Sequence, residues 1–261
     1  SPADRAGIRA GDRVVKIDNV PTAGLPARAI ALRLAGDKGS KVSIEVERGP
    51  RLEPDSVSVT VKRAMPKLGL KGSMFASNVL GKNLDDPSFE PLWATAEELG
   101  AFMFIHPNNV AGADQMKSYY LGNLIGNPLD TTIAAACLIF GGVMDRHPKL
   151  KIMLAHGGGF TPYQAARWEH GWKVRPEPKK NVPAQPKGIA KRFNYDTILH
   201  SAEALEAMIG LVGSERVMLG SDYPYDMAMM DCVSHVRSLK IADAAKDAIL
   251  NGNAEKILAG K

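Results

Sequence analysis

Three short apolar runs of the sequence each end in a residue that can bind a metal or move a proton. FMFI is followed by His106, KIMLA by His156 and VMLGS by Asp222. In parallel α/β proteins the active site lies at the carboxyl ends of the strands, so these side chains can meet there. Imidazole nitrogens and a carboxylate suit metal binding and proton transfer. Two plainer interpretations stay open, because a strand-end histidine can be structural and an aspartate can cap a helix.

The elements that would position these residues alternate between strand and helix after residue 68. This alternation is typical of a parallel sheet with helical crossovers. The predicted strands are residues 70–76, 102–105, 152–155, 193–195 and 217–220. The predicted helices are residues 89–99, 116–144 with a break near Gly126 and Pro128, 162–172, 202–211 and 242–258. Residues 65–261 are therefore expected to form one α/β domain, with a surface loop at 173–187.

Residues 1–64 have a different pattern, typical of a small β-rich module. Alternating apolar residues predict strands at 13–17, 41–48 and 56–61. Asp18-Asn19 is a turn signal. A helix is expected at 27–35, closed by Gly36.

The composition argues against several classes of partner. The chain has 261 residues, 45% of them hydrophobic and 23% charged, which is ordinary for a globular protein. Its net charge of +5 is not gathered in a dense basic block, so we expect no nucleic-acid binding. The apolar run at residues 133–144 is shorter than the roughly 20 residues of a membrane span and is expected to be a buried helix. The distant Cys137 and Cys232 predict no disulfide framework.

The HGGG sequence that begins at His156 also occurs in the oxyanion loop of esterases. That fold requires a G-x-S-x-G elbow, which the sequence lacks, so an esterase is not expected. Three other histidines invite no chemistry. His147 lies in the loop-like DRHP sequence and is expected to be solvated, and His170 and His235 are expected on helix surfaces.

Several of these motifs together resemble one known family. LAHGGGFTPYQAARW and VMLGSDYPY are similar to the amidohydrolase-related family that contains aminocarboxymuconate-semialdehyde decarboxylase. The segments that also match this family, in their order along the chain, are GLKGSMFASN, LDDPSFEPLWATAEELG, FIHP, GNPLDTTIAAACLIFGGVMDRHPKLKIMLAHGGG and FNYDTILH. The resemblance covers essentially everything after Pro66. It implies the C-terminal part of a TIM-like (β/α) barrel of the metal-dependent hydrolase type.

The resemblance also implies roles for particular residues. His106 and Asp222 would bind the metal, Zn²⁺ or another divalent ion, and Asp222 would take part in catalysis. His156 would be the catalytic acid and base, since a histidine can move a proton at neutral pH. Three residues would bind a small carboxylate substrate: Arg167, reaching across a homodimer interface, together with Tyr225 and His200.

The sequence departs from the family pattern in two places. The first strand of the family barrel carries a His-x-His pair of metal ligands, and no His-x-His occurs in this chain. About five strands are predicted after Pro66, whereas a closed barrel has eight. The N-terminal part of the barrel is therefore expected to be missing. Asn108 and Asn109 follow FIHP where the decarboxylase has an aromatic residue, which leaves the substrate open.

Residues 1–64 resemble a bacterial PDZ domain of the type found in carboxy-terminal processing proteases. The match is carried by SPADRAGIRAGDRVVKIDNVPT, the helix at 27–35, GSKVSIEVERG and VSVTVKRA. PDZ domains bind peptide C-termini at a sheet edge. The chain begins after the carboxylate-binding loop of such a domain, so we expect a truncated module that binds no peptide C-terminus.

Three functions are compatible with these features. The first is a metal-dependent decarboxylase that acts on a small carboxylated unsaturated or aromatic molecule. The second is a hydrolase of a lactone or amide on the same scaffold, and the third is a non-catalytic PDZ-type scaffold protein. The expected assembly is a homodimer without a membrane partner. The expected compartment is the cytoplasm, or the periplasm if the PDZ resemblance decides it.

Overall fold

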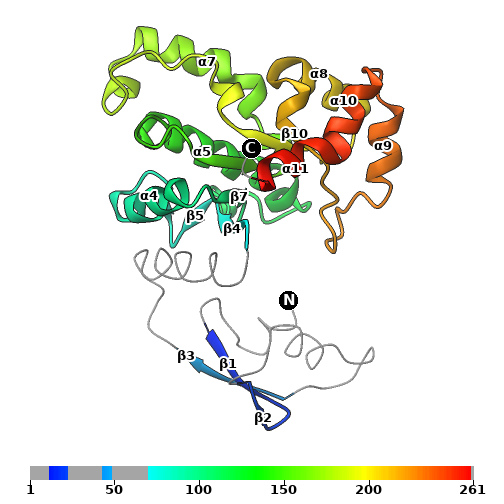
Figure 1. The fold of residues 1–261 in the computed structure, drawn as a ribbon. Coiled ribbons are helices and arrows are strands. Elements are labelled where there is room, and N and C mark those ends of the chain that lie inside the picture. The colour runs from blue at the N-terminus through cyan, green and yellow to red at the C-terminus, as the bar shows by residue number, and fades with distance from the viewer. Residues whose placement is uncertain (1–11, 23–42, 49–69, 260–261) are drawn as a thin grey trace. The chain divides into compact units, whose positions relative to one another are not determined.

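Figure 1 shows the fold of the chain in a computed structural model, which describes residues 12–22, 43–48 and 70–259. The chain divides into two compact units, Ser1–Ser56 and Val57–Lys261. The predicted helix at 27–35, the predicted strand at 56–61 and the predicted domain boundary at 64 lie outside the described residues.

The first unit contains an antiparallel sheet of order β2-β1-β3. Its strands are β1 (Asp12–Ile17), β2 (Val20–Pro21) and β3 (Ile44–Arg48). Asp18 and Asn19 join β1 to β2 with φ of 48° and 65°, a left-handed conformation that these two residue types tolerate. The predicted strand at 13–17 and its turn are therefore confirmed. An antiparallel sheet of these three strands does not distinguish a PDZ domain from another small β-rich module. The PDZ interpretation therefore stays a prediction.

The second unit is built on a parallel sheet of five strands, in the order β10-β9-β8-β7-β4. The α/β prediction is thus confirmed, with strand ends moved by one or two residues in most cases. The strands are β4 (Gly72–Ala76), β7 (Phe102–His106), β8 (Lys151–Leu154), β9 (Asn194–Asp196) and β10 (Val217–Met218), and a separate hairpin is formed by β5 (Asn78–Val79) and β6 (Lys82–Asn83).

Helices follow the strands as the sequence predicts (Figure 1). The C-terminal segment is helical, as predicted. A π-helical turn, η8 (Ala248–Gly252), joins α10 to α11 without a gap. The helices are α4 (Glu90–Glu98), α5 (Asn127–Phe140), α6 (Val143–Arg146), α7 (Thr161–Val174), α8 (Ala202–Val212), α9 (Cys232–Ser238), α10 (Asp243–Asp247) and α11 (Asn253–Leu258). Short 3-10 turns occur at η1 (Pro87–Phe89), η2 (Ala113–Gln115), η4 (His156–Gly158), η5 (Glu177–Lys179), η6 (Ile189–Arg192) and η7 (Ser214–Arg216).

The two faces of the parallel sheet differ in burial. On β7, Met103 and Ile105 are fully buried and join a core that includes Trp93 of α4, Leu138 of α5 and Leu205 of α8. The alternate residues point the other way and stay partly accessible. They line a cavity of about 390 Å³ together with side chains of the neighbouring strands: Met74, Phe102, Phe104, Met153, Met218 and Leu219. The sheet therefore has a helix-covered face and an accessible face, as one sector of a barrel wall would.

The predicted helix break near Gly126 and Pro128 is wrong. The chain is helical from a π-helical turn, η3 (Gly122–Gly126), directly into α5, and Pro128 lies in the first turn of α5. The helix ends instead at Gly141, followed by Gly142 with a φ of 75°.

The joined helix Gly122–Phe140 is apolar enough and long enough, by those two measures, to cross a bilayer. Core helices of globular proteins pass the same test, and 39% of its most apolar window is buried in the protein. The predicted buried helix is confirmed for one face of α5, where Ala134, Ala135, Leu138 and Ile139 are fully buried.

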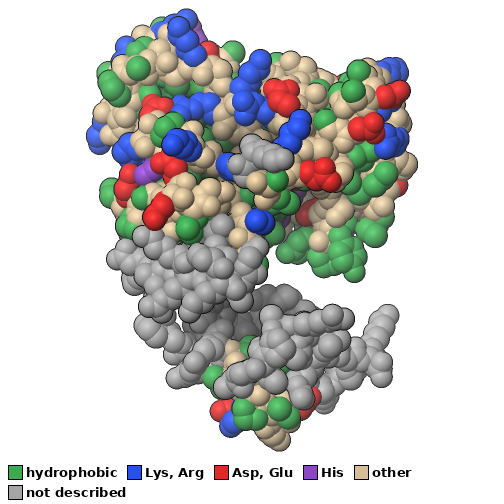
Figure 2. All heavy atoms as spheres, viewed as in Figure 1, with side chains coloured by type: hydrophobic (Ala, Val, Ile, Leu, Met, Phe, Trp, Pro, Cys, Tyr) green, Lys and Arg blue, Asp and Glu red, His purple; other side chains and the backbone are tan. Residues whose placement is uncertain are grey.

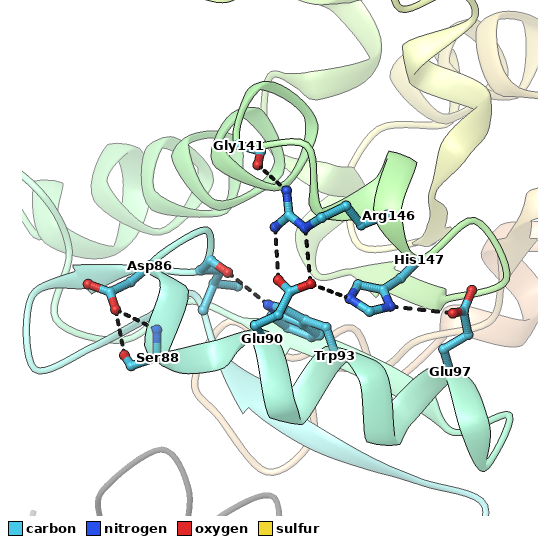
Figure 3. Close-up of polar contacts among 9 residues, drawn as sticks. Asp86, Ser88, Glu90, Trp93, Glu97, Gly141, Arg146 and His147 are labelled. Carbon is cyan, nitrogen blue, oxygen red and sulfur yellow. Dashed lines mark hydrogen bonds and ion pairs between the residues drawn. The ribbon is translucent and has the colours of Figure 1, made fainter. Parts of the chain in front are cut away.

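The prediction of a solvated His147 is also wrong. Only 8% of this residue is exposed, and its two ring nitrogens face Glu90 and Glu97 of α4, at 2.8 Å and 3.3 Å (Figure 3). Arg146 donates two hydrogen bonds to the same Glu90 carboxylate and a third to the carbonyl of Gly141. Together these contacts fasten the end of α6 to α4, through residues about 50 positions apart in the sequence.

Replacing Glu90 with glutamine removes the charge that Arg146 and His147 face. The free energy of unfolding should fall by about 1 kcal/mol at about pH 7, a small loss because water partly screens the carboxylate. Hydrogen bonding to Arg146 lowers the pKa of Glu90 below its ordinary value of 4.5. Its stabilising contribution is complete above the unfolded pKa and disappears as the pH falls through the lower folded pKa. Urea unfolding of both proteins should therefore show a difference that closes in acid.

Glu177→Gln is the matched control for this prediction. Its ion pair with Arg175 lies at the surface, with both side chains more than 60% exposed. Such a pair contributes little to stability, because water screens both charges. A Glu90→Gln difference that stayed constant down to about pH 3 would contradict the role of the carboxylate charge.

Candidate active site

The three strand-end residues meet in space, as the sequence predicts. The ligand atoms of His106, His156 and Asp222 all lie within 4.8 Å of one another. His106 is the last residue of β7, His156 follows β8, and Asp222 follows β10. All three side chains are partly buried. The geometry of the predicted site is confirmed, and the chemical roles of its residues stay predictions.

His106 presents one ring nitrogen to the site. Its Nδ1 lies 3.0 Å from the carbonyl oxygen of Pro107, so Nδ1 carries the proton and Nε2 keeps its lone pair. Burial lowers the pKa of His106, and the nearby His156 lowers it further. The neutral imidazole that results is the form that can bind a metal. The predicted substrate residue Tyr225 stacks on the His106 ring, with centroids 6.1 Å apart.

His156 is held by its backbone. Its φ is 55°, a left-handed value that costs a residue with a side chain about 1–3 kcal/mol unless the surroundings enforce it. The carboxylate of Asp196 enforces it by accepting hydrogen bonds from the backbone N–H groups of His156, Gly157 and Ile198. Burial raises the pKa of Asp196, whereas the His156 ring and these amides act against the rise.

The side chain of His156 faces Asp222, with 3.8 Å between Nε2 and Oδ1. Its other ring nitrogen, Nδ1, is buried and has no hydrogen-bond partner among the described residues. Asp222 also has a left-handed backbone, with a φ of 56°. His156 and Asp222 face each other in space, and both have backbone conformations that cost free energy. Such conformations cluster at functional sites.

A buried polar network attaches β4 to the segment that carries His106. Ser77 donates its backbone N–H to the His106 carbonyl at 3.0 Å, and its hydroxyl accepts the N–H of Asn108 at 3.2 Å. The Asn78 amide reaches the carbonyl oxygens of Asn108 and Asn109. The carboxylate of Asp130 in α5 accepts hydrogen bonds from both the Ser77 hydroxyl and the Asn78 amide. The loop after His106 is thus fixed from one side by a single buried carboxylate.

A first cavity of about 560 Å³ opens at these residues. Among the described residues its lining has no lysine or arginine and includes two carboxylates, so these residues offer an anion no lysine or arginine side chain. Tyr225 lies in the lining, as predicted, and so does Asn108. The lining residues are Met74, Phe75, Ala76, His106, Pro107, Asn108, Tyr120, Asn123, Asn127, His156, Asp222, Tyr225 and Asp226.

The other two predicted substrate residues lie elsewhere. His200 has a φ of 55° and lines a neighbouring second cavity of about 470 Å³. Arg167 is exposed on α7 and lies outside the linings of both cavities. This position is compatible with the expectation that Arg167 serves a second subunit, since its own site does not include it.

Hydrophobic side chains gather around the loop between β10 and α9, at the lower right of the second unit in Figure 2. The large exposed apolar residues of this segment are Tyr223, Tyr225, Met230 and Val233. Contiguous exposed apolar surface often marks a binding region. Of these four residues, Tyr225 also lines the first cavity, so this apolar surface reaches the site.

Four residues of the site were not predicted. Asp196 directly follows the predicted strand 193–195, so the strand-end rule could have found it. Asp130, Asn123 and Asn127 lie within a helical stretch, and only the fold shows that Asp130 faces β4 while both asparagines line the two cavities. The π-helical turn η3 next to Asn127 is a form of helix that is frequent at functional sites.

The donor set fits a divalent metal. His106 offers a lone pair on Nε2, His156 has a buried nitrogen without a partner, and Asp222 offers a carboxylate oxygen. Two imidazoles and one carboxylate are ligands that zinc and other divalent ions accept. If His156 had a structural role alone and bound neither metal nor water, its Nδ1 would stay buried without a hydrogen bond. Such a loss costs about 1–3 kcal/mol.

The family model for amidohydrolases (Amidohydro_2) matches residues 6–259. The chain belongs to the amidohydrolase family. The match runs through both units and does not separate a PDZ-like segment from the rest. The resemblance deduced from the strand-end motifs is confirmed at the level of the family.

The amidohydrolase chain is similar to decarboxylases. It is 40% identical over 200 residues to 2-amino-3-carboxymuconate-6-semialdehyde decarboxylase of Dictyostelium discoideum, an alignment that covers 76% of this chain and 56% of that protein. The chain thus spans a little more than half the length of this curated relative.

Two solved structures share the fold of the amidohydrolase chain. The 5-carboxyvanillate decarboxylase LigW from Sphingomonas paucimobilis has 28% sequence identity and a TM-score of 0.70, with 79% of this chain and 63% of that chain covered. LigW2 from Novosphingobium aromaticivorans, a D314N mutant solved with bound manganese, has 23% identity and a TM-score of 0.71, with 79% and 62% covered.

Proposed function

We propose that the chain carries the acid–base and metal-binding half of a metal-dependent decarboxylase whose substrate is a small carboxylated aromatic or unsaturated molecule. The observation that carries this proposal is the meeting of His106, His156 and Asp222 at one cavity. The relatives support it, because decarboxylases of an amino-carboxymuconate semialdehyde and of a carboxyvanillate are similar to this chain.

The charge of the cavity supports a bound cation. Among the described residues, a substrate carboxylate that enters the first cavity meets two aspartates and no lysine or arginine. Burying an uncompensated anion there would be costly. We assign His106 and Asp222 to a divalent metal, Zn²⁺ or Mn²⁺, which supplies positive charge and polarises a substrate oxygen when it is bound. The LigW2 structure, described with manganese, makes Mn²⁺ as much a candidate as Zn²⁺.

His156 is the residue that we assign to proton transfer. Decarboxylation breaks the bond between a carbon and its carboxylate carbon, releases CO2, and places a proton on the carbon that remains. His156 lines both cavities and its side chain faces Asp222. It can therefore give its proton to that carbon and take up another proton afterwards. A histidine is suited to this task near neutral pH.

Arg167 and a homodimer belong to the same proposal. A guanidinium matches a carboxylate in a two-pronged geometry. Because Arg167 is exposed and lies outside both cavities of its own chain, it would act on the site of a second subunit. The absence of a His-x-His pair leaves His106 and Asp222 as the protein ligands that we assign, so the metal is expected to bind less tightly than with three or four ligands.

The full chain tests this function directly. After loading with Zn²⁺ or Mn²⁺ and dialysis, metal content is measured together with CO2 release from 5-carboxyvanillate, 2,6-dihydroxybenzoate and 2-amino-3-carboxymuconate 6-semialdehyde. We expect one metal per chain and CO2 release that a chelator abolishes. Hydrolysis of lactones without CO2 release would instead support a hydrolase. A chain that binds no metal and turns over neither class would contradict an enzymatic role.

A further inference from the structure

The second cavity has a different character from the first. Apolar side chains from four segments surround it, and its lining contains no lysine or arginine within the part of the chain that the structure describes. Its polar atoms come mainly from the wall that it shares with the first cavity. The apolar lining residues are Leu124, Pro128, Phe160, Tyr163, Ile198, Leu199, Ala204 and Met227.

The two cavities share one wall. Asn123, Asn127, His156 and Asp222 line both of them. A molecule bound beside His156 and Asp222 in the first cavity can therefore extend past these residues into the second. Each volume, about 560 Å³ and about 470 Å³, lies in the range of small-molecule sites.

The walls of the second cavity are braced rather than loosely packed. The hydroxyl of Tyr163 donates a hydrogen bond to the Ala204 carbonyl at 3.2 Å, which ties α7 to α8 across the cavity. Leu199 packs so closely on Gly157 that a Cβ there would lie 2.5 Å from it. The N–H of Phe160 is bonded to the Thr132 hydroxyl at 2.8 Å. The segments that carry Phe160, Tyr163, Leu199 and Ala204 are thus held by contacts of their own.

We infer that the second cavity receives an apolar arm of the substrate, an alkyl or aryl substituent on the molecule whose carboxylate lies between His106, His156 and Asp222. This inference rests on the proposed function, since it assumes a carboxylate in the first cavity. The site would then select among carboxylated aromatic molecules by substituent. His200, predicted to bind substrate, would contact the arm rather than the carboxylate.

Asn123 and Asn127 would lie where the head of the substrate joins the arm. They are four residues apart, Asn123 within the π-helical turn η3 and Asn127 directly after it, and both line the shared wall. Asparagine amides both donate and accept hydrogen bonds. A hydroxyl, amino or carbonyl group on the ring, next to the carboxylate, matches them. The substrate class that follows is an aromatic carboxylate with a polar neighbour and an apolar substituent.

Calorimetric titration of the Zn²⁺-loaded full chain with benzoate and with its 3- and 4-ethyl, butyl and hexyl derivatives tests the inference. For one of the two series we expect the Kd to fall about fourfold for each added methylene until the cavity is filled. Benzoate binding without any gain from the alkyl groups overturns the inference and leaves the proposed function standing. Failure of benzoate itself to bind overturns both.

Two variants assign the gain to this cavity. Ala204→Phe fills it and should abolish the gain, whereas Leu211→Phe, at an exposed position of the same helix, should retain it. If Ala204→Phe does not fold, Phe160→Ala removes a partly exposed wall and should reduce the gain to twofold or less per methylene. A gain that survives both cavity variants places the arm elsewhere. Loss of a dimer on Ala204→Phe, without loss of the gain, would assign the cavity to a second copy instead.

Discussion

The variant His156→Ala is expected to lower decarboxylation by about 10²–10⁴-fold while the metal content stays unchanged. The size of the effect follows from the reaction, because the carbon that loses CO2 must gain a proton in the same site. His156 is the group between both cavities that can supply it. The measurement is the rate of CO2 release at saturating substrate, with metal determined on the same samples.

Loss of metal from His156→Ala would reassign this residue as a ligand. The structure makes that a real alternative, because ligand atoms of His106, His156 and Asp222 all lie within 4.8 Å of one another and could therefore bind one ion. His170→Ala is the control, since His170 is exposed on α7 and lines neither cavity. It should leave both CO2 release and metal content unchanged. Equal losses in both variants would contradict a specific role for His156.

The pH dependence of the reaction separates the two roles further. A group that delivers protons in the rate-limiting step makes the rate fall along a descending limb at high pH, where the group has lost its proton. That limb should vanish in His156→Ala, and the small remaining rate should vary little with pH. A residue that only shapes the cavity would leave the limb in place.

The site could be predicted because strand ends are a local property that the sheet then brings together. His106 follows β7 and His156 follows β8, and Ile105 pairs with Leu154 in parallel register. Side chains that leave neighbouring strands at the same edge must lie close. The sequence pattern therefore determined where the chemistry lies without any knowledge of the helices. The same rule would have identified Asp196, which ends β9.

What failed depends on residues far apart in the chain. His147 is buried because Glu90 and Glu97 approach it from α4, and the surrounding DRHP sequence contains no sign of either. The break expected at Gly126 and Pro128 came from local propensities, which the packing of α5 into the core outweighs. The second cavity is lined by residues of η3, α5, α7 and α8 and of neighbouring loops, so its existence depends on how these segments pack rather than on any motif.

Asp130→Ala is expected to lower the free energy of unfolding by about 3 kcal/mol, the second large effect. Asp130 is only 4% exposed, and its carboxylate is the shared acceptor for Ser77 and Asn78. Its removal leaves the Ser77 hydroxyl without this acceptor and takes one of three acceptors from the Asn78 amide. A buried donor without a partner costs about 1–3 kcal/mol. Asp114→Ala is the control, because that side chain is 97% exposed and should change stability by about 0.5 kcal/mol or less.

The same variant separates a positioning role from a purely structural one. Ser77 and Asn78 fix the loop after His106, so without Asp130 the His106 ring should be less well placed. Groups that orient ligands in this way typically contribute about 10–100-fold to metal affinity. We expect a loss of that size in Zn²⁺ titrations performed well below the melting temperature. Asp130→Asn, which keeps one acceptor oxygen, should recover part of both effects. If stability falls while metal affinity stays at its original value, Asp130 supports the fold alone, and the loop after His106 holds its place through the β4–β7 register by itself.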